Sequence, residues 1–384
     1  MKIGRLTRSL ARPFVKECEQ WLRRLIGEEL GESTSVLENR IDLLSLRISP
    51  PLRDPAHRWH LLQIGITDLC NLLCAHCTRT PGARLNGTVP LKTFRFYLSR
   101  FSPDWFDCLL ISDWGEPTIV KSLLDYLYFA KLSGWNQVQM FTNATNPNEH
   151  LLEEIIAQQL LSLLFVSVEG ATPELYESIR KNPFERFQSF LKLVSRLKEK
   201  FNSPMEMAFN VVCMRKNLAE LPAIIEMAAR FGASRVQMVH INPIGYLRGE
   251  ENDKLCIPEQ HLDSMDRKQV LYTFERVFTI AERHNIVVHA PESFPEITGP
   301  QPQMISSTDL KCSFPLQWVH VGFHGDIFPC CQMGERLPMG NIHKLDFFSI
   351  WNNLKYKTLI DGLRPGGSPA DVCADCNILA GKSF

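Results

Sequence analysis

Three cysteines lie on one short stretch, Cys70-Asn-Leu-Leu-Cys74-Ala-His-Cys77, directly after an apolar run. Thiolates are strong ligands for soft metals, and three of them on one loop can bind one face of a metal cluster. No fourth ligand follows nearby. A site that is one ligand short keeps a coordination position open for substrate, whereas structural zinc sites are closed by four protein ligands. The stretch therefore predicts a catalytic metal centre.

The cysteines of the chain gather in two places. The chain has 12 cysteines, and five of them form a second group near the C-terminus: Cys312, Cys330, Cys331, Cys373 and Cys376. The isolated ones are Cys18, Cys108, Cys213 and Cys256. Buried structural cysteines would be scattered, so this grouping predicts metal ligands in both places.

Composition bounds the class of protein. A chain of 384 residues with 45% hydrophobic and 22% charged residues predicts a globular protein of two or three domains. Lys+Arg and Asp+Glu are both 42, so the charge balance gives no sign of nucleic-acid binding. No apolar run is long enough to span a bilayer, and the basic first residues lack the apolar core of a signal peptide. We therefore expect a cytoplasmic protein that binds neither nucleic acid nor membranes.

An α/β framework is predicted to position the first cysteine loop. Short apolar runs lie at 61–67, 108–112, 137–141, 163–168, 206–212 and 235–240. Amphipathic stretches lie between them, at 91–101, 119–132, 150–159, 184–200 and 218–231. Strands that alternate with helices of this length predict βαβ units and a parallel sheet. Polar motifs follow several of the runs, at the strand ends where α/β proteins place their chemistry.

The remaining segments differ from this framework. Residues 1–55 predict an N-terminal helical extension, because apolar side chains recur at helical spacing and a proline-rich linker follows. Residues 244–310 predict a connecting segment with a helix at 262–284 and a short strand at 286–289. Residues 311–384 predict a small cysteine-bearing α+β module. The main framework, which carries the first cysteine loop, spans 56–243.

The spacing Cys-x3-Cys-x2-Cys resembles the signature of the radical S-adenosylmethionine (radical SAM) enzymes. The resemblance implies a partial (β/α)6 barrel in which Cys70, Cys74 and Cys77 hold a 4Fe–4S cluster that binds SAM at its open iron. Reductive cleavage of SAM would release a 5′-deoxyadenosyl radical that abstracts a hydrogen atom. His76 lies where the family places an aromatic residue beside the adenine; an exposed loop histidine is the alternative. A zinc knuckle completed by a distant ligand is the alternative for the cysteines.

Three strand ends resemble the SAM-binding elements of the same family. Gly115, Glu116 and Pro117 resemble its Gly-Glu-Pro element for the SAM amino group, with Trp114 where a first glycine is usual. Asn143 follows the third predicted strand, where it implies a contact with the SAM carboxylate or the substrate, or a turn residue. The fourth strand ends in Ser167 and Glu169, similar to the element that reaches the SAM ribose, and Arg180 follows as a candidate carboxylate contact.

The C-terminal cysteines resemble the SPASM/Twitch extension of radical SAM enzymes. The resemblance implies one auxiliary 4Fe–4S cluster bound by Cys312, Cys330, Cys373 and Cys376, because too few cysteines remain for a second. Cys331 competes with Cys330, since adjacent side chains on a strand point to opposite faces. A four-cysteine zinc ribbon is the alternative.

Together these resemblances predict an enzyme that oxidises or cross-links an unactivated C–H bond of a peptide or other natural-product substrate. We expect SAM as co-substrate and an external flavodoxin- or ferredoxin-type electron donor. A redox-neutral epimerase is the alternative, with Cys213 or Cys256 as hydrogen-atom donor. A zinc-bearing scaffold without catalysis is the alternative from another class.

Overall fold

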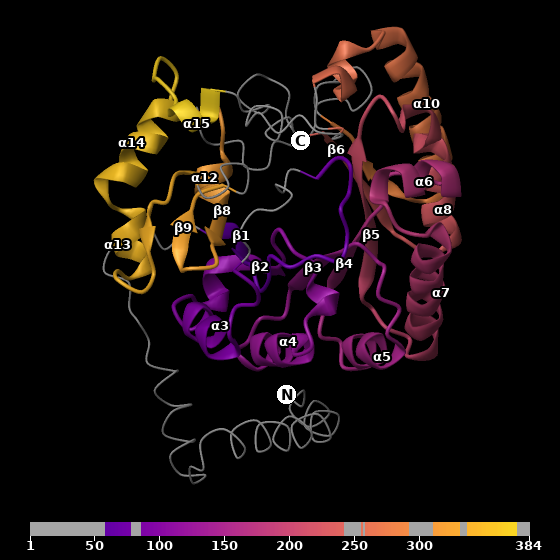
Figure 1. Cartoon of the computed structure of the whole chain (residues 1–384). Helices are drawn as coiled ribbons and strands as arrows, with labels where there is room; N and C mark the ends of the chain where they lie inside the picture. Colours follow the sequence, from indigo (N-terminus) through magenta and orange to yellow (C-terminus); the bar gives the residue numbers. More distant parts are fainter. Residues whose placement is uncertain are drawn as a thin grey trace, which may run out of the picture. The chain divides into compact units, whose positions relative to one another are not determined.

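The described part of the chain forms one ten-stranded, mostly parallel sheet with helices packed against it (Figure 1). This computed structural model describes residues 58–77, 86–241, 255, 258–291, 310–330 and 336–374. The predicted extension at 1–55 lies outside these residues. All described residues belong to one compact unit, 55–384.

Seven of the ten strands in the described residues follow predicted apolar runs, and the three in the C-terminal region were not predicted. The ten strands are β1 (Trp59–Ile64), β2 (Phe106–Ile111), β3 (Val138–Thr142), β4 (Leu163–Ser167), β5 (Glu206–Cys213), β6 (Arg235–His240), β7 (Val287–His289), β8 (Trp318–Val321), β9 (Asp326–Phe328) and β10 (Gly340–Asn341). Strands β1 to β7 pair in parallel in chain order, as repeated βαβ units require. The predicted parallel framework is confirmed.

The helices connect these strands and cover one face of the sheet (Figure 1). They are α3 (Leu91–Leu98), α4 (Leu123–Leu132), α5 (Glu149–Ala157), α6 (Pro173–Arg180), α7 (Phe184–Lys200), α8 (Leu221–Arg230), α10 (Arg267–His284), α12 (Phe314–Gln317), α13 (Phe347–Trp351), α14 (Leu354–Leu363) and α15 (Asp371–Ala374). The helix expected at 119–132 begins only at Leu123, because a 3-10 turn at Pro117–Ile119 precedes it. The short helix α6 was not predicted.

The two faces of the sheet bury different side chains. On β1, Leu62 and Ile64 belong to the large core between sheet and helices. Their neighbour Leu61 points to the other face, where it packs with Cys108 and Leu110 of β2. This alternation follows from the two-residue period of a strand. The second face has only small apolar clusters, so it leaves room for polar side chains near the strand ends.

The C-terminal region joins the same sheet instead of forming a sheet of its own. Strand β8 pairs in parallel with β1, and β9 and β10 follow as antiparallel strands at that edge. Aromatic packing fixes helix α13 nearby, because the Trp59 ring lies 5.1 Å from Phe347 and 4.9 Å from Trp351 between centroids. The C-terminal region is thereby attached to β1, the strand before the first cysteine loop, through β8.

Candidate active site

The loop of Cys70, Cys74 and Cys77 begins a few residues after β1 ends, at the carboxyl edge of the sheet. The amide of Cys77 donates to the carbonyl of Cys74 at 3.1 Å, which makes a tight turn between these two cysteines. At the base of the loop, the Asp68 carboxylate accepts hydrogen bonds from the backbone amides of Asn86 at 2.7 Å and Gly87 at 2.8 Å. The loop is therefore anchored at its base as well as folded within itself.

Gly115 packs against the chain just before Cys70. Its amide donates to the Thr67 carbonyl at 3.1 Å, and the Glu116 amide donates to the Leu69 carbonyl at 2.8 Å. A Cβ at Gly115 would lie 2.5 Å from both of these carbonyl oxygens. Only glycine permits this approach, so the predicted Gly-Glu-Pro element supports the cysteine loop through its backbone.

The carboxylate of Glu116 is buried and fully hydrogen-bonded. Its Oε1 accepts from the Thr118 amide at 3.0 Å and from the hydroxyls of Thr118 and Thr142 at 2.6 and 2.8 Å. Its Oε2 accepts from the Asn143 amide at 2.6 Å. Burial raises the pKa of Glu116, and these hydrogen bonds oppose that shift. The side chain ties the end of β2 to the end of β3, and Pro117 starts the turn that follows.

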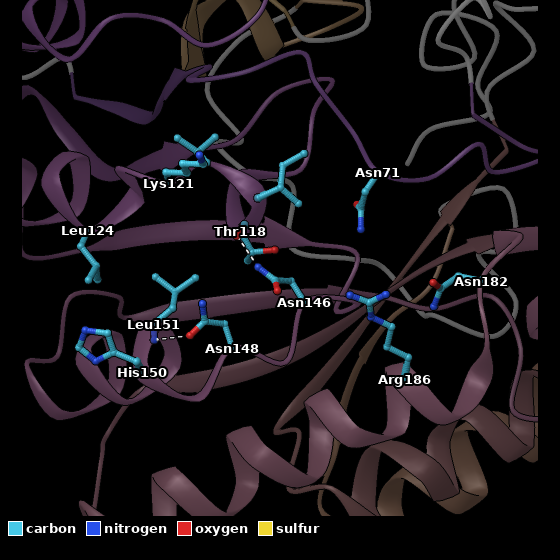
Figure 2. Close-up of a pocket in the computed structure, with 12 residues that line it drawn as sticks. Asn71, Thr118, Lys121, Leu124, Asn146, Asn148, His150, Leu151, Asn182 and Arg186 are labelled. Carbon is cyan, nitrogen blue, oxygen red and sulfur yellow. Dashed lines mark hydrogen bonds between the residues drawn. The ribbon is translucent and has the colours of Figure 1, made fainter.

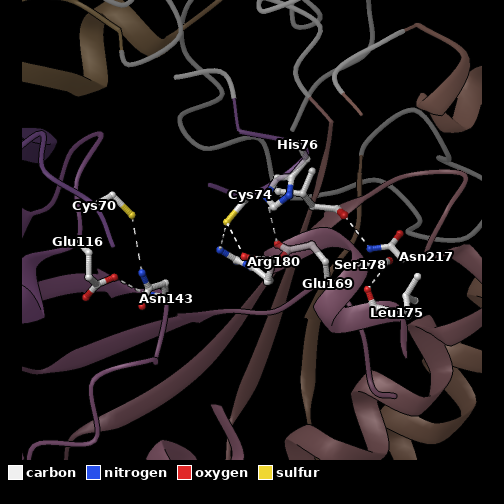
Figure 3. Close-up of polar contacts among 11 residues, drawn as sticks. Cys70, Cys74, His76, Glu116, Asn143, Glu169, Leu175, Ser178, Arg180 and Asn217 are labelled. Atoms are coloured by element: carbon white, nitrogen blue, oxygen red, sulfur yellow. Dashed lines mark hydrogen bonds and ion pairs between the residues drawn. The ribbon is translucent and has the colours of Figure 1, made fainter. Parts of the chain in front are cut away.

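Asn143 continues this connection to the cysteine loop (Figure 3). Its Nδ2 donates to the Asn71 side chain at 2.8 Å and lies 3.8 Å from the Cys70 sulfur, within hydrogen-bond range for sulfur. Its Oδ1 accepts from the amide and hydroxyl of Thr145 at 3.1 and 2.7 Å. The contacts of Asn143 thus go to the loop and its own turn, and it positions Cys70.

On the other side of the loop, Cys74 contacts the buried ion pair of Arg180 and Glu169 (Figure 3). The Arg180 Nη1 donates to the Cys74 sulfur at 3.6 Å, and the Arg180 Nε donates to Glu169 Oε2. The other carboxylate oxygen, Oε1, lies 3.7 Å from His76 Nε2 and is without a hydrogen bond. The expected ribose contact, Glu169, thus has one oxygen in the ion pair and one open to a ligand.

Burial controls protonation in this cluster. It raises the pKa of the Cys74 thiol to about 11, with Arg180 opposing the shift. It lowers the pKa of His76 to about 4. Burial alone would also lower the pKa of Arg180, but Glu169, Cys74 and Tyr176 together outweigh burial and raise that pKa. His76 is therefore neutral near pH 7, and its side chain is only 11% exposed, unlike the exposed loop histidine of the alternative.

The donor set of the loop suits a cluster better than a single ion. None of the three cysteines is in a disulfide. Among the described residues, no three Cys, His, Asp or Glu side chains lie close enough to share one metal ion. The ligands of one zinc ion all lie about 2.0–2.3 Å from it, whereas three thiolates of a 4Fe–4S cluster bind three different irons. Three thiols on one loop match in number the protein ligands of a 4Fe–4S cluster with one open iron.

Other predicted residues lie along the same sheet edge or outside the described residues. Ser167 ends β4 and pairs in register with Asn210 of β5, so both lie near the edge that carries the loop. Cys213 ends β5 but is fully buried in the core between sheet and helices. Burial raises the pKa of its thiol. This placement weighs against a hydrogen-atom donor, and Cys256 lies outside the described residues.

Three of the four predicted auxiliary-cluster ligands are described. Cys330, just after β9, and Cys373 of α15 are 5% and 7% exposed, and Cys312 is partly buried. Electrostatic interaction with Cys330 contributes to raising the pKa of Tyr356, after the larger effect of burial. Cys376 and its competitor Cys331 lie outside the described residues, so the ligand set remains a prediction.

A separate cavity of ≈ 680 Å³ reaches the cysteine loop at Asn71 (Figure 2). Its lining includes the cationic side chains of Lys121 and Arg186 together with His150, and no carboxylate among the described residues. None of the residues predicted to contact metal or SAM lines it. The described part of the chain also contains no helix long and apolar enough to cross a bilayer.

Sequence reasoning named Arg180 but missed its contact with the cysteine loop, and it missed Thr142 altogether. The contact between Arg180 and Cys74 joins residues 106 positions apart, and Thr142 reaches Glu116 across 26 positions. Only Thr172-Pro173 could have indicated α6, because Thr172 caps that helix by accepting from the Leu175 amide at 3.4 Å.

Comparisons with known proteins agree with this geometry. Residues 64–228 match the radical SAM superfamily, and residues 312–377 match the SPASM iron–sulfur cluster-binding domain. The AdoMet-dependent heme synthase of Methanosarcina barkeri is 23% identical over 83% of this chain and 91% of its own length. The PqqA peptide cyclase of Xanthomonas axonopodis is 22% identical over 76% of this chain and 73% of its own.

Solved structures show the same fold. SuiB of Streptococcus suis bound to S-adenosylmethionine has a TM-score of 0.64 at 16% identity, and the match covers 96% of this chain and 82% of SuiB. SuiB bound to its precursor peptide SuiA has a TM-score of 0.62 at 17% identity, covering 96% and 83%. The two domain matches imply iron–sulfur clusters and SAM binding. The chain therefore belongs to the radical SAM superfamily and carries a C-terminal SPASM domain, which makes it a radical SAM enzyme.

Proposed function

We propose that this enzyme cleaves SAM reductively at a 4Fe–4S cluster held by Cys70, Cys74 and Cys77 and abstracts a hydrogen atom from an unactivated C–H bond of a peptide. The observation that carries the proposal is the loop itself, in which three thiols lie between two supports. Gly115 and Asn143 hold the side that leads to Cys70, and Arg180 holds Cys74. When bound, the cluster supplies the electron that cleaves SAM.

The chain's own residues provide a pocket for the polar groups of SAM. Glu169 Oε1 is buried and has no hydrogen-bond partner, which is costly unless a ligand supplies a donor. A ribose hydroxyl is such a donor. His76, held neutral by burial, presents a flat uncharged ring beside it, as stacking against adenine requires. The side chain of Glu116 already accepts hydrogen bonds from four donors. The Gly-Glu-Pro element would therefore contact SAM through its backbone groups.

A peptide is the substrate class that the relatives favour. SuiB was solved with a precursor peptide, and the PqqA peptide cyclase is named for a peptide substrate. The AdoMet-dependent heme synthase aligns over more of this chain, so a small-molecule substrate is the second candidate.

The C-terminal region suits an electron-accepting role. We propose one auxiliary 4Fe–4S cluster bound by Cys312, Cys330, Cys373 and Cys376, on the SPASM domain whose strand β8 flanks β1. In an oxidation, the substrate loses one hydrogen atom to the 5′-deoxyadenosyl radical. An auxiliary cluster held by these cysteines would accept the one electron that the substrate radical has to lose, and the proton would pass to solvent. A flavodoxin- or ferredoxin-type carrier would supply the electron that starts each cycle.

The test uses anaerobically reconstituted full-length protein with SAM, dithionite and short peptides encoded beside its gene. Formation of 5′-deoxyadenosine together with a peptide that has lost two hydrogen atoms supports oxidation or cross-linking. A peptide that keeps its mass in water but gains one deuterium in heavy water indicates epimerisation instead.

The matched control is Cys74→Ala, which must abolish both products. If 5′-deoxyadenosine forms but no neighbouring peptide changes, while a tetrapyrrole substrate does, the peptide assignment is wrong and the small-molecule candidate holds.

A further inference from the structure

Arg180 occupies an unusual place for an arginine, because it is almost completely buried at the end of α6. Its Nη1 points at the Cys74 sulfur, 3.6 Å away, and its Nε points at Glu169 (Figure 3). Arg180 is 6% exposed and Glu169 is 0% exposed. The Arg180 guanidinium thus links a buried carboxylate to a predicted cluster ligand.

The backbone holds this arrangement in place. The Ala75 amide, next to Cys74, donates to the Ile179 carbonyl at 2.8 Å. The end of α6 is therefore hydrogen-bonded to the cysteine loop by this bond and by the Cys74 thiol, which donates to the Arg180 carbonyl at 3.8 Å. Thr172 caps the other end of the helix, and Lys181 closes it in the left-handed conformation at φ 57°. The guanidinium is consequently fixed relative to the sulfur.

We propose that Arg180 and Glu169 set the reduction potential of the cluster held by Cys70, Cys74 and Cys77, with Arg180 raising it and Glu169 restraining that effect. The inference rests on the proposed function, because it requires a cluster on this loop. Both residues would act through the cluster, because their charges change the energy of the electron that it accepts. This role differs from the SAM contacts that the family resemblance implies for them.

The sign of each effect follows from charge. Reduction adds one electron to the cluster and its thiolates. A cation that donates a hydrogen bond to a ligating sulfur stabilises the reduced state, and hydrogen bonds to the sulfurs are a known determinant of cluster potentials. Glu169 is farther from the sulfur, behind the guanidinium, and its negative charge opposes the electron. Salt and water screen neither charge well, because both are buried.

A purely structural ion pair makes a different prediction. If Arg180 and Glu169 only stabilise the fold, removing either one leaves the other charge buried and unpaired, and both changes perturb the site in the same direction. If they tune the cluster, the two changes shift its potential in opposite directions. The direction of the shift therefore separates the two roles.

The experiment compares Arg180→Gln, Glu169→Gln and the double variant in the full-length, reconstituted protein. Each is titrated with dithionite while electron paramagnetic resonance follows the reduced cluster whose signal changes on addition of SAM. At a fixed potential, we expect the ratio of reduced to oxidised cluster to fall about tenfold in Arg180→Gln, a shift of about −59 mV for one electron. Glu169→Gln should raise that ratio, and the double variant should lie between them.

Two further variants provide controls. Arg196→Gln removes a surface arginine that pairs with Glu149 at 2.6 Å and has a 61% exposed side chain, so it should leave the potential unchanged. Arg180→Lys keeps the positive charge and should recover most of the shift. Iron content and the melting temperature of each apoprotein show whether a variant has lost its cluster or its fold.

The outcomes are distinct. Opposite shifts in the two single variants support the inference. Shifts of the same sign, or an unchanged potential in Arg180→Gln with full iron content, overturn it. If Arg180→Gln does not take up iron, the Glu169→Gln and double variants decide the sign. A wild-type protein without any SAM-sensitive cluster signal contradicts the proposed function itself.

Discussion

Glu116 gives the most direct test of how the site is held together. Each oxygen of its buried carboxylate accepts a backbone amide, from Thr118 on one side and from Asn143 on the other, at 3.0 and 2.6 Å. In Glu116→Ala both amides lose their acceptor inside the protein. A buried donor without a partner costs about 1–3 kcal/mol, so we expect a loss of about 2–6 kcal/mol in the free energy of unfolding.

Glu116→Gln refines this prediction. A glutamine amide has only one oxygen, so in either orientation its NH2 group faces one of the two backbone amides. We expect about half the loss seen for alanine, about 1–3 kcal/mol. Because the Asn143 amide is one of the two donors, and Asn143 contacts the Cys70 sulfur, both variants should also bind less iron at the first loop.

The assay is urea denaturation of the apoprotein, followed by iron analysis after anaerobic reconstitution. Glu149→Gln is the matched control, because Glu149 is 60% exposed and paired with a surface arginine. It should stay within about 0.5 kcal/mol of the wild type. A Glu116→Ala protein with wild-type stability and iron content would refute the reasoning.

Three further predictions follow from the same structure. Gly115→Ala places a Cβ 2.5 Å from two backbone carbonyl oxygens, so we expect weaker iron binding at the first loop, measured as iron per chain. In the control, Gly366→Ala, a Cβ meets no atom within 4 Å and the only strain comes from the φ of 79°, so iron binding at the first loop should not change. His76 is buried with its pKa lowered to about 4, so its contribution to stability is complete above pH 6.5 and is lost as pH falls through 4. Between pH 7 and pH 4, the apoprotein should therefore lose about 3 kcal/mol less of its free energy of unfolding in His76→Gln than in the wild type. An equal loss in both proteins would contradict this prediction. Trp351→Ala removes a ring that packs 4.9 Å from Trp59 and should cost about 3–5 kcal/mol, seen as earlier unfolding of the C-terminal region in hydrogen exchange.

The strands of the sheet could be predicted because each is a short stretch rich in apolar residues, continuous in β4 and alternating with polar residues in β6. Runs such as 163–168 and 235–240 coincide with β4 (Leu163–Ser167) and β6 (Arg235–His240) almost residue for residue. Local sequence contains this information, since a strand buried on both faces must be apolar throughout. The cysteine loop was predictable for a similar reason, because all three thiols lie in one contiguous stretch, from Cys70 to Cys77.

The rest of the site depends on contacts between distant residues. Nothing near β8 indicates that it pairs with β1, more than 250 positions earlier, because strand pairing is decided by the whole fold. The sequence also predicted Glu116 as a SAM contact from its motif. The structure shows four donors on its carboxylate, and two of them come from Thr142 and Asn143, whose proximity local sequence does not reveal.

The central claim is that Cys70, Cys74 and Cys77 hold the cluster that cleaves SAM. The most direct measurement is 5′-deoxyadenosine formed by the reduced, reconstituted protein, together with iron per chain, in the wild type and in a variant with all three cysteines changed to alanine. The account predicts about eight irons and product in the wild type, and about four irons and no product in the variant. Equal product formation in both proteins, or a wild type that carries zinc and no iron, would contradict it.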